Sequence, residues 1–208
     1  MFRYLTFITM VSLVSLVSVG PALAENQEET TFSEYSLSAS LSPFGGSLNF
    51  GYNASEKTTW QVSVGGFKGG APFKPKIGGT EYSVSGYTQW VGCFINHRPI
   101  SGHEWFRVVA GMGLGTIQNR VKDDAGNEYR VDYKENPVGY VGIGFGAEAK
   151  QGFIWGFDIG LLHTGGPQYP MKVASADGDT SNASEEIADY WFFGSVLPNL
   201  QLTLGYGF

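Results

Sequence analysis

The fold is decided by the stretch Tyr35-Ser36-Leu37-Ser38-Ala39-Ser40-Leu41-Ser42, in which every second residue is serine and the residues between are apolar. Successive side chains of a β-strand point to opposite faces of the sheet. A strand with this sequence therefore has one apolar face and one face of small hydroxyl groups. A fold that uses such a strand must place these two faces in different surroundings.

The same alternation returns in seven further segments, which we predict to be strands: residues 47–53, 59–67, 83–97, 105–117, 137–149, 153–163 and 199–208. In residues 83–97 we assign Val84, Thr88, Trp90 and Phe94 to the apolar face. The chain also holds 30 glycines and is 15% aromatic. Glycine is poor in helices and aromatic residues favour strands, so the composition agrees with an all-β fold.

The length of these segments favours a membrane barrel over a soluble sandwich with its apolar faces turned inward. They approach the about 9–11 residues with which a tilted strand crosses a bilayer, whereas soluble strands average about 5–6 residues. Serine and glycine suit the narrow lumen of eight strands, and a closed barrel leaves no backbone group unpaired in hydrocarbon. We predict a transmembrane up-and-down antiparallel β-barrel of about eight strands.

The N-terminus reads as a secretory signal peptide, residues 1–24. Arg3 precedes an apolar stretch from Leu5 to Val19, and Ala22-Leu23-Ala24 is a small-x-small cleavage pattern. The alternative is a retained anchor, but the apolar stretch is shorter than the roughly 20 residues of a transmembrane helix. We therefore expect export to the outer membrane, a short N-terminal segment at residues 25–34, and a barrel at residues 35–208.

Charge and cysteine content exclude several classes of function. The net charge of −6 argues against a nucleic-acid partner, which requires a basic surface. Cys93 is the single cysteine, so no intrachain disulfide or cysteine-based metal cluster can form. The acidic residues 177–186 lack the spacing of a calcium loop, with Asn182 and Ala188 at its glycine and glutamate positions. We expect no cofactor and no metal.

Long and short connections alternate along the chain after the first hairpin. Residues 53–58, 98–104 and 150–152 are short, whereas residues 68–82, 118–136 and 164–198 are long and polar. Outer-membrane barrels have short periplasmic turns and longer external loops, so the long connections should lie outside. Lys68, Lys74 and Lys76 could suit lipopolysaccharide phosphates. The aromatic run 190–193 should extend the last strand or form a contact surface.

The C-terminal segment 199–208 resembles the closing strand of bacterial outer-membrane proteins. That strand ends in phenylalanine, with an aromatic residue two positions earlier and alternating apolar residues before it; here the matching residues are Leu202, Leu204, Tyr206 and Phe208. The resemblance implies that these residues form the signal read by the barrel-assembly machinery. The whole chain is similar in length and layout to the small eight-stranded barrels of the OmpA and OmpX type.

Charged residues on the inward face predict an ion pair in the lumen. Arg107 and Glu148 are symmetric about residue 127, so an antiparallel hairpin centred there would bring them together, and Asp158 could join them. The pair would serve as a plug, since charges in a narrow low-dielectric lumen persist only if paired, or alternatively as a proton or ion path. The plug is favoured because eight strands do not leave an aqueous channel.

Aromatic residues with outward parity predict interfacial girdles, formed by Trp60, Trp90, Phe106, Trp155, Tyr206 and Phe208. His163 shares this parity, but Gly165 stands where a lipid A deacylase would carry its serine, so we expect no enzyme. The predicted function is a non-enzymatic outer-membrane barrel whose external loops carry a structural or surface role. Its expected partners are membrane lipid, lipopolysaccharide and an unidentified external ligand. A lipid A-modifying enzyme and a narrow pore are the alternatives.

Overall fold

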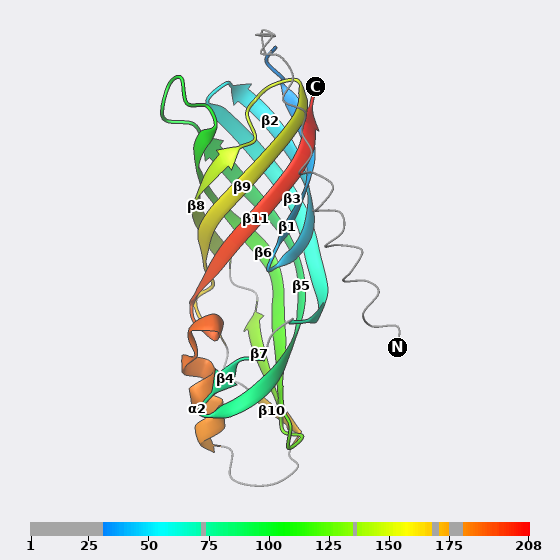
Figure 1. Ribbon diagram of the computed structural model, residues 1–208, viewed down its shortest axis with the longest axis vertical. Coiled ribbons are helices and arrows are strands. Elements are labelled where there is room, and N and C mark those ends of the chain that lie inside the picture. Colours follow the sequence, from blue (N-terminus) through cyan, green and yellow to red (C-terminus); the bar gives the residue numbers. More distant parts are fainter. Residues whose placement is uncertain (1–30, 72–73, 135–136, 168–170, 175–180) are drawn as a thin grey trace, which may run out of the picture. The chain divides into compact units, whose positions relative to one another are not determined.

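Eight antiparallel strands close into a ring (Figure 1). The computed structural model describes residues 31–71, 74–134, 137–167, 171–174 and 181–208. The ring consists of β1 (Tyr35–Ser42), β2 (Gly45–Ser55), β3 (Thr58–Gly70), β5 (Thr80–His97), β6 (Phe106–Asp123), β8 (Val138–Gly146), β9 (Gly152–His163) and β11 (Val196–Gly207). It closes where β1 pairs with β11, with Leu41 opposite Leu202. The predicted eight-stranded barrel is confirmed, while the predicted signal peptide lies outside the described residues.

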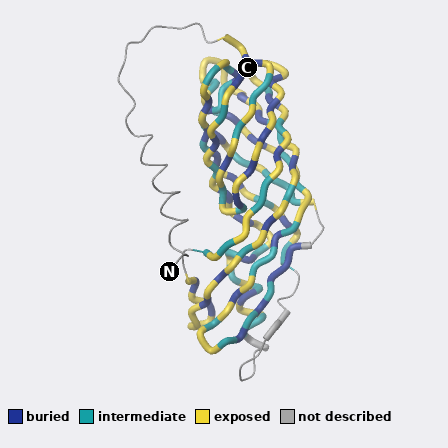
Figure 2. The backbone as a smooth tube through the Cα atoms, turned by 90° about the vertical axis from the view of Figure 1, so that its right-hand side faces the viewer, coloured by how far each residue is buried: buried dark blue, intermediate teal, exposed yellow. Residues whose placement is uncertain are grey.

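The side chains of the ring are arranged with polar groups inside and apolar groups outside. Along β2, Ser47 and Asn49 are buried, whereas Leu48 and Phe50 are 62% and 47% exposed. Figure 2 shows the same alternation of exposed and buried residues along the other strands of the ring. A soluble sandwich would bury the apolar face, so the structure contradicts that alternative.

The outward apolar residues form a continuous band on the ring. On β6 they run from Phe106 to Leu114, on β9 from Phe153 to Leu161, and on β11 from Leu200 to Phe208. These stretches match the about 9–11 residues that a tilted strand needs to cross a bilayer. We call the ring end with the short turns after β2, β5 and β8 the turn end.

The polarity of the two faces inverts where β5 and β6 continue beyond this band. After Leu114, the outward residues of β6 are Thr116, Gln118, Arg120 and Lys122, whereas Ile117 and Val121 point inward and are buried. On β5, Val91 faces Leu114 and Gln89 faces Thr116, so both strands invert at the same level. The outer segments of β5 and β6 therefore have the pattern of a soluble sheet.

Further elements complete this outer region, which we call the outer cap. They are β4 (Lys76–Ile77), β7 (Glu128–Lys134), β10 (Met171–Ala174), α2 (Ser181–Asp189) and the 3₁₀ helix η2 (Trp191–Phe193). β7 takes over from β8 as the partner of β6 and pairs with its residues 116–122. Buried side chains from the cap and the adjoining strands form one apolar core: Ile77, Tyr82, Val84, Ile117, Val121, Tyr129, Val131, Tyr133, Ile187, Phe193 and Leu197.

The cap corrects the expectation that the long connections are polar loops. The aromatic run 190–193 does not extend the last strand: residues 191–193 form η2, in which Phe193 is fully buried and Trp191 is 63% exposed. Part of the predicted acidic loop is helical in α2, and residues 175–180 lie outside the described residues. Within the described ranges, no helix has both the length and the apolar character needed to cross a membrane.

Candidate functional site

A buried ion pair closes the lumen near the turn end. The Arg107 guanidinium on β6 donates from one nitrogen to both carboxylate oxygens of Asp158 on β9, at 2.8 and 2.7 Å. The intervening strand β8 supplies Gly144, which lies opposite both residues. A Cβ atom on Gly144 would stand 2.1 Å from the Asp158 carboxylate and 2.7 Å from Arg107 Nε, so the pair forms because residue 144 lacks a side chain.

The predicted contact between Arg107 and Glu148 is wrong. β6 and β8 pair in a register that sets Arg107 opposite Gly144, four residues before Glu148. Glu148 falls in the turn between β8 and β9, where its carboxylate lies 3.2 Å from the Lys150 ammonium. Asp158, predicted as an additional member of the cluster, is the ion-pair partner of Arg107.

A second buried arginine, Arg98, was not among the predicted site residues. It directly follows β5, and its side chain is turned back into the lumen and is 2% exposed. The guanidinium donates to the hydroxyl of Thr59 at 3.1 Å, to the carbonyl of Glu56 at 3.3 Å and to the carbonyl of Ala147. No carboxylate of the described residues forms an ion pair with Arg98. Alternation could not reveal it, because it lies beyond the end of its strand.

The β8–β9 turn brings the two arginines to neighbouring acceptors. Arg107 donates to the carbonyl of Gly146 at 2.5 Å, and Arg98 donates to the carbonyl of the next residue, Ala147. Both acceptor residues have positive φ, 72° for Gly146 and 51° for Ala147. A non-glycine residue in this region costs about 1–3 kcal/mol and persists where its surroundings require it. The strained turn thus aims two successive carbonyls at the two guanidinium groups.

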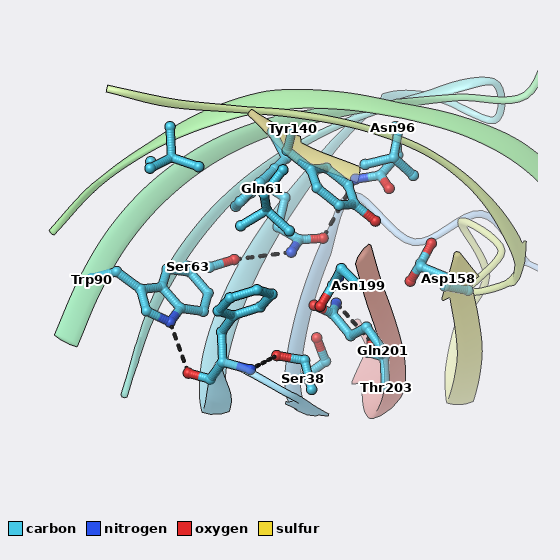
Figure 3. A pocket seen from close by; sticks show the side chains of 18 of the residues that line it. Ser38, Gln61, Ser63, Trp90, Asn96, Tyr140, Asp158, Asn199, Gln201 and Thr203 are labelled. Carbon is cyan, nitrogen blue, oxygen red and sulfur yellow. Dashed lines mark hydrogen bonds between the residues drawn. The ribbon is translucent and has the colours of Figure 1, made fainter. Parts of the chain in front are cut away.

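Neutral hydroxyl and amide groups line one side of the middle of the lumen. The Ser40 and Thr203 hydroxyls are 2.7 Å apart, and the Asn49 amide donates to Ser40 at 2.7 Å. Figure 3 shows Gln61 between Ser63 and Asn96, with hydrogen bonds of 2.9 and 3.4 Å. This side of the lumen is therefore a hydrogen-bonded wall without charged groups, as the small polar residues of β1 and β2 predict.

Aromatic side chains line the other side of the lumen, which corrects the predicted parity of β5. Trp90 does not belong to the outward girdle: it points inward and donates from its indole nitrogen to the Phe44 carbonyl at 3.3 Å (Figure 3). Phe94 also points inward and packs edge-to-face against Tyr140, with ring centroids 5.8 Å apart. The register explains both positions, since outward Val62 and Val64 of β3 lie opposite Cys93 and Val91.

The inward glycines provide the surfaces on which these rings lie. A Cβ atom on Gly65 would come within 2.7 Å of the Trp90 ring, and one on Gly111 within 2.4 Å of the Phe94 ring. A Cβ atom on Gly160 would come within 2.4 Å of the Tyr140 hydroxyl and 2.5 Å of its ring. The glycine-rich inner face thus accommodates aromatic side chains within a barrel of eight strands.

Gly160→Ala is expected to destabilise the barrel by about 1–3 kcal/mol, the usual cost of overpacking, because the added methyl group displaces the Tyr140 ring. Urea unfolding in detergent, followed by tryptophan fluorescence, measures the change. In the background of Tyr140→Ala, the same substitution should cost much less, because the three heavy atoms nearest to the new Cβ all belong to Tyr140. An equal cost in both backgrounds would contradict the packing role.

The lumen encloses a cavity of about 120 Å³ whose lining includes ion-pair, polar-wall and aromatic residues. Ile117, Leu162 and Tyr133 line its cap side, where the apolar core begins. The Tyr133 hydroxyl is buried without a hydrogen-bond partner among the described residues, and burial raises the pKa of Tyr133. The cavity thus lies between the buried charged residues of the turn end and the apolar core of the outer cap.

Tyr133→Phe is expected to stabilise the protein by about 1 kcal/mol, because it removes a buried hydroxyl that lacks a partner. The raised pKa also predicts a pH dependence. Above the ordinary value of 10.0 the unfolded tyrosine ionises while the folded one stays neutral, so stability falls as the pH rises above 10. Chemical unfolding at pH 8 and pH 11 should show a smaller alkaline loss in Tyr133→Phe. An equal loss would place the titration elsewhere.

The other predicted girdle residues point outward at the turn end. Trp60, Trp155, Tyr206 and Phe208 are all more than half exposed, and Phe106 packs against Phe145 with ring centroids 6.0 Å apart. The residues of the predicted assembly signal share the outward face of β11, with Leu202 and Leu204 about half exposed. The structure thus leaves these side chains available for lipid or protein contact.

The strand register identifies the residues beside His163. His163 lies at the end of β9, is exposed, and faces Val196 on β11 and Gly139 on β8, neither of which carries a nucleophile. Across the described ranges, no group of three or more histidine, cysteine or acidic side chains is arranged to hold a metal ion.

Comparisons with known proteins support the fold. No protein-family model and no curated protein matches the chain. The chain is similar to the crystal structure of Acinetobacter baumannii CarO, with 16% identity and a TM-score of 0.63, covering 85% of this chain and 98% of that one. It is also similar to Acinetobacter baumannii CarO2, with 14% identity and a TM-score of 0.64, covering 86% of this chain and 100% of that one. At these identities the likeness concerns the fold alone.

Proposed function

We propose that this chain is a non-enzymatic integral protein of the bacterial outer membrane, exported by a cleaved signal peptide. The observation that carries the proposal is the ring of eight strands with apolar side chains exposed on its outer surface. In water such a surface would cause the protein to aggregate, whereas in a bilayer its apolar side chains contact the lipid hydrocarbon. Lipid contacts this band, the aromatic residues of the turn end lie at the headgroups, and the β11 signal engages the barrel-assembly machinery.

The closed lumen favours a structural or surface role over transport. The Arg107–Asp158 pair and Arg98 lie across the turn end, and the apolar cap core adjoins the other end. The outer cap then presents the functional surface to the exterior. We assign the binding of the unidentified external ligand to this surface.

The outward face of the cap suits the phosphates of lipopolysaccharide. Lys68 is exposed at the outer end of β3, two residues beyond the level at which polarity inverts: it lies opposite Tyr87 of β5, which pairs with Gln118 of β6. The other predicted lysines are less available: Lys74 lies 3.7 Å from Asp124, and Lys76 is opposite Glu81. We therefore assign the phosphate contacts first to Lys68.

The mobility of unboiled and boiled protein from the outer-membrane fraction tests the membrane assignment. A folded barrel resists cold detergent, so the unboiled protein should migrate differently from the boiled one, and alkaline extraction should leave it in the membrane. Recovery of a soluble periplasmic protein without a heat-dependent shift would refute the assignment. Lipid A mass spectra on overexpression test the enzymatic alternative, for which a changed mass abolished by His163→Ala would be required.

A narrow pore is the second candidate, favoured by the cavity inside the ring, whose lining includes polar and charged residues. Planar-bilayer recording of the purified protein distinguishes the two functions. The closed lumen predicts no discrete conductance in the unaltered protein. Regular conductance steps that change on neutralisation of Arg107 would favour the pore.

A further inference from the structure

The turn end of the lumen carries more buried positive than negative charge. Among the described residues at this end, Arg98, Arg107 and Asp158 are 2%, 3% and 4% exposed, so one buried carboxylate accompanies two buried guanidinium groups. Asp158 is engaged by Arg107 through both oxygens, and Arg98 is held by neutral acceptors. A buried cation without a counter-ion is costly, because the low-dielectric interior does not replace its hydration.

The two guanidinium groups are held close together despite their like charge. They donate to the carbonyls of the successive residues Gly146 and Ala147. Glu148, the next residue, lines the same cavity but is paired with Lys150 and is about one-third exposed. The nearest further carboxylate on this turn is thus already neutralised.

Unsatisfied polar atoms identify the cavity as the place where an occupant is needed. Among the described residues, Arg98 Nε, Arg107 Nε, Tyr133 Oη and Asn199 Oδ1 are buried without a hydrogen-bond partner. All four of these side chains line the lumen cavity. Buried polar groups are normally satisfied by protein, water or ligand, and at the turn end both unsatisfied atoms are donors that carry positive charge.

We propose that the turn end of the lumen is a binding site for a small monovalent anion, a halide or a short carboxylate. The anion accepts hydrogen bonds from Arg98 and Arg107 and offsets the excess buried charge. Charge-assisted hydrogen bonds of this kind are the stronger ones in proteins. This site goes beyond the proposed surface role and does not depend on it.

Chloride line broadening in ³⁵Cl NMR of the purified barrel in detergent tests the site, with acetate as the competing carboxylate. The unaltered protein should broaden the chloride line, and acetate should reverse the broadening. Arg98→Gln should weaken chloride binding about tenfold or more, the loss expected for one charge-assisted hydrogen bond. Lys57→Gln is the matched control, because it removes an exposed cation at the same end of the barrel and should leave binding unchanged.

The urea midpoint of unfolding gives a second readout, since an anion that binds the folded state alone raises it. At equal ionic strength, chloride and acetate should each raise the midpoint relative to a bulky sulfonate that cannot enter the lumen. Acetate acting while chloride does not would restrict the site to carboxylates, and the reverse would restrict it to halides.

Several outcomes would overturn the proposal. Absence of chloride broadening together with no effect of acetate on the urea midpoint, or equal broadening in the unaltered protein and Arg98→Gln, would leave the cavity to water alone. Binding that appears first in Glu148→Gln would identify Glu148 as the native counter-ion. If Arg98→Gln fails to fold, crystals of the unaltered protein in bromide decide: an anomalous peak at the guanidinium groups supports the site, and a lumen without bromide refutes it.

Discussion

Asp158→Ala is expected to destabilise the folded barrel by about 3–5 kcal/mol, the usual cost of removing one partner from a buried ion pair. The substitution leaves Arg107 buried without its carboxylate, close to Arg98, which forms no ion pair with any carboxylate of the described residues. Two adjacent buried cations would then repel each other in a low-dielectric lumen. Urea unfolding in detergent measures the loss, and a smaller fraction of heat-modifiable protein should accompany it.

Glu148→Gln is the matched control for this prediction. Glu148 is about one-third exposed and pairs with Lys150, so its neutralisation should cost about 1 kcal/mol or less. The double substitution Arg107→Met and Asp158→Leu should recover most of the loss, because apolar residues of similar volume often replace a buried pair at little cost. Equal losses for Asp158→Ala and Glu148→Gln would mean that Glu148 is the functional partner of the lumen cations.

Phe193→Ala is expected to destabilise the outer cap by about 3–5 kcal/mol, as typically found when a buried phenylalanine is truncated. The side chain is fully buried in the core formed by α2, η2 and the outer segments of β5, β6 and β7. Because the ring is stabilised by its own strand pairing and by detergent or lipid, the cap should open while the ring stays closed. Limited proteolysis should then cut within residues 164–195, and the heat-dependent mobility shift should remain.

Trp191→Ala provides the control within the same helical turn. Trp191 is 63% exposed, so its removal should change cap stability by about 0.5 kcal/mol or less. Loss of the mobility shift in Phe193→Ala together with cleavage would show that cap and ring unfold as one unit. Resistance of both variants to protease would show that the cap does not depend on the Phe193 anchor.

The parity of β5 shows where reasoning from alternation fails. Placing Trp90 and Phe94 outward assumed that the lumen accepts small polar groups alone, but the ring holds aromatic side chains where facing glycines leave room. Those glycines lie on other strands, such as Gly65 on β3 and Gly111 on β6. A contact between a large residue and a distant glycine leaves no trace in either local sequence.

The ion pair shows a similar limit. Arg107 and Asp158 both have the predicted inward parity, but their pairing depends on the register between β6, β8 and β9. The hairpin centre estimated from the sequence assumed one continuous hairpin between β6 and β8. β7 occupies the outer part of β6, and Arg107 lies opposite Gly144 instead of Glu148.

The sequence alone determined the eight strands and the outward face of β1, β2, β9 and β11, because the period-two pattern is local and both surroundings, hydrocarbon and lumen, select residues in a simple way. The tertiary structure decided the outer cap, the inward aromatic residues and the partners of Arg98 and Arg107. Beyond Leu114, strand β6 leaves the apolar band and packs against Tyr129 and Val131 of β7. Its apolar side chains therefore point inward there, and its polar side chains point outward. Whether a strand face meets lipid, water or a protein core decides this reversal, and these surroundings form only when the chain folds.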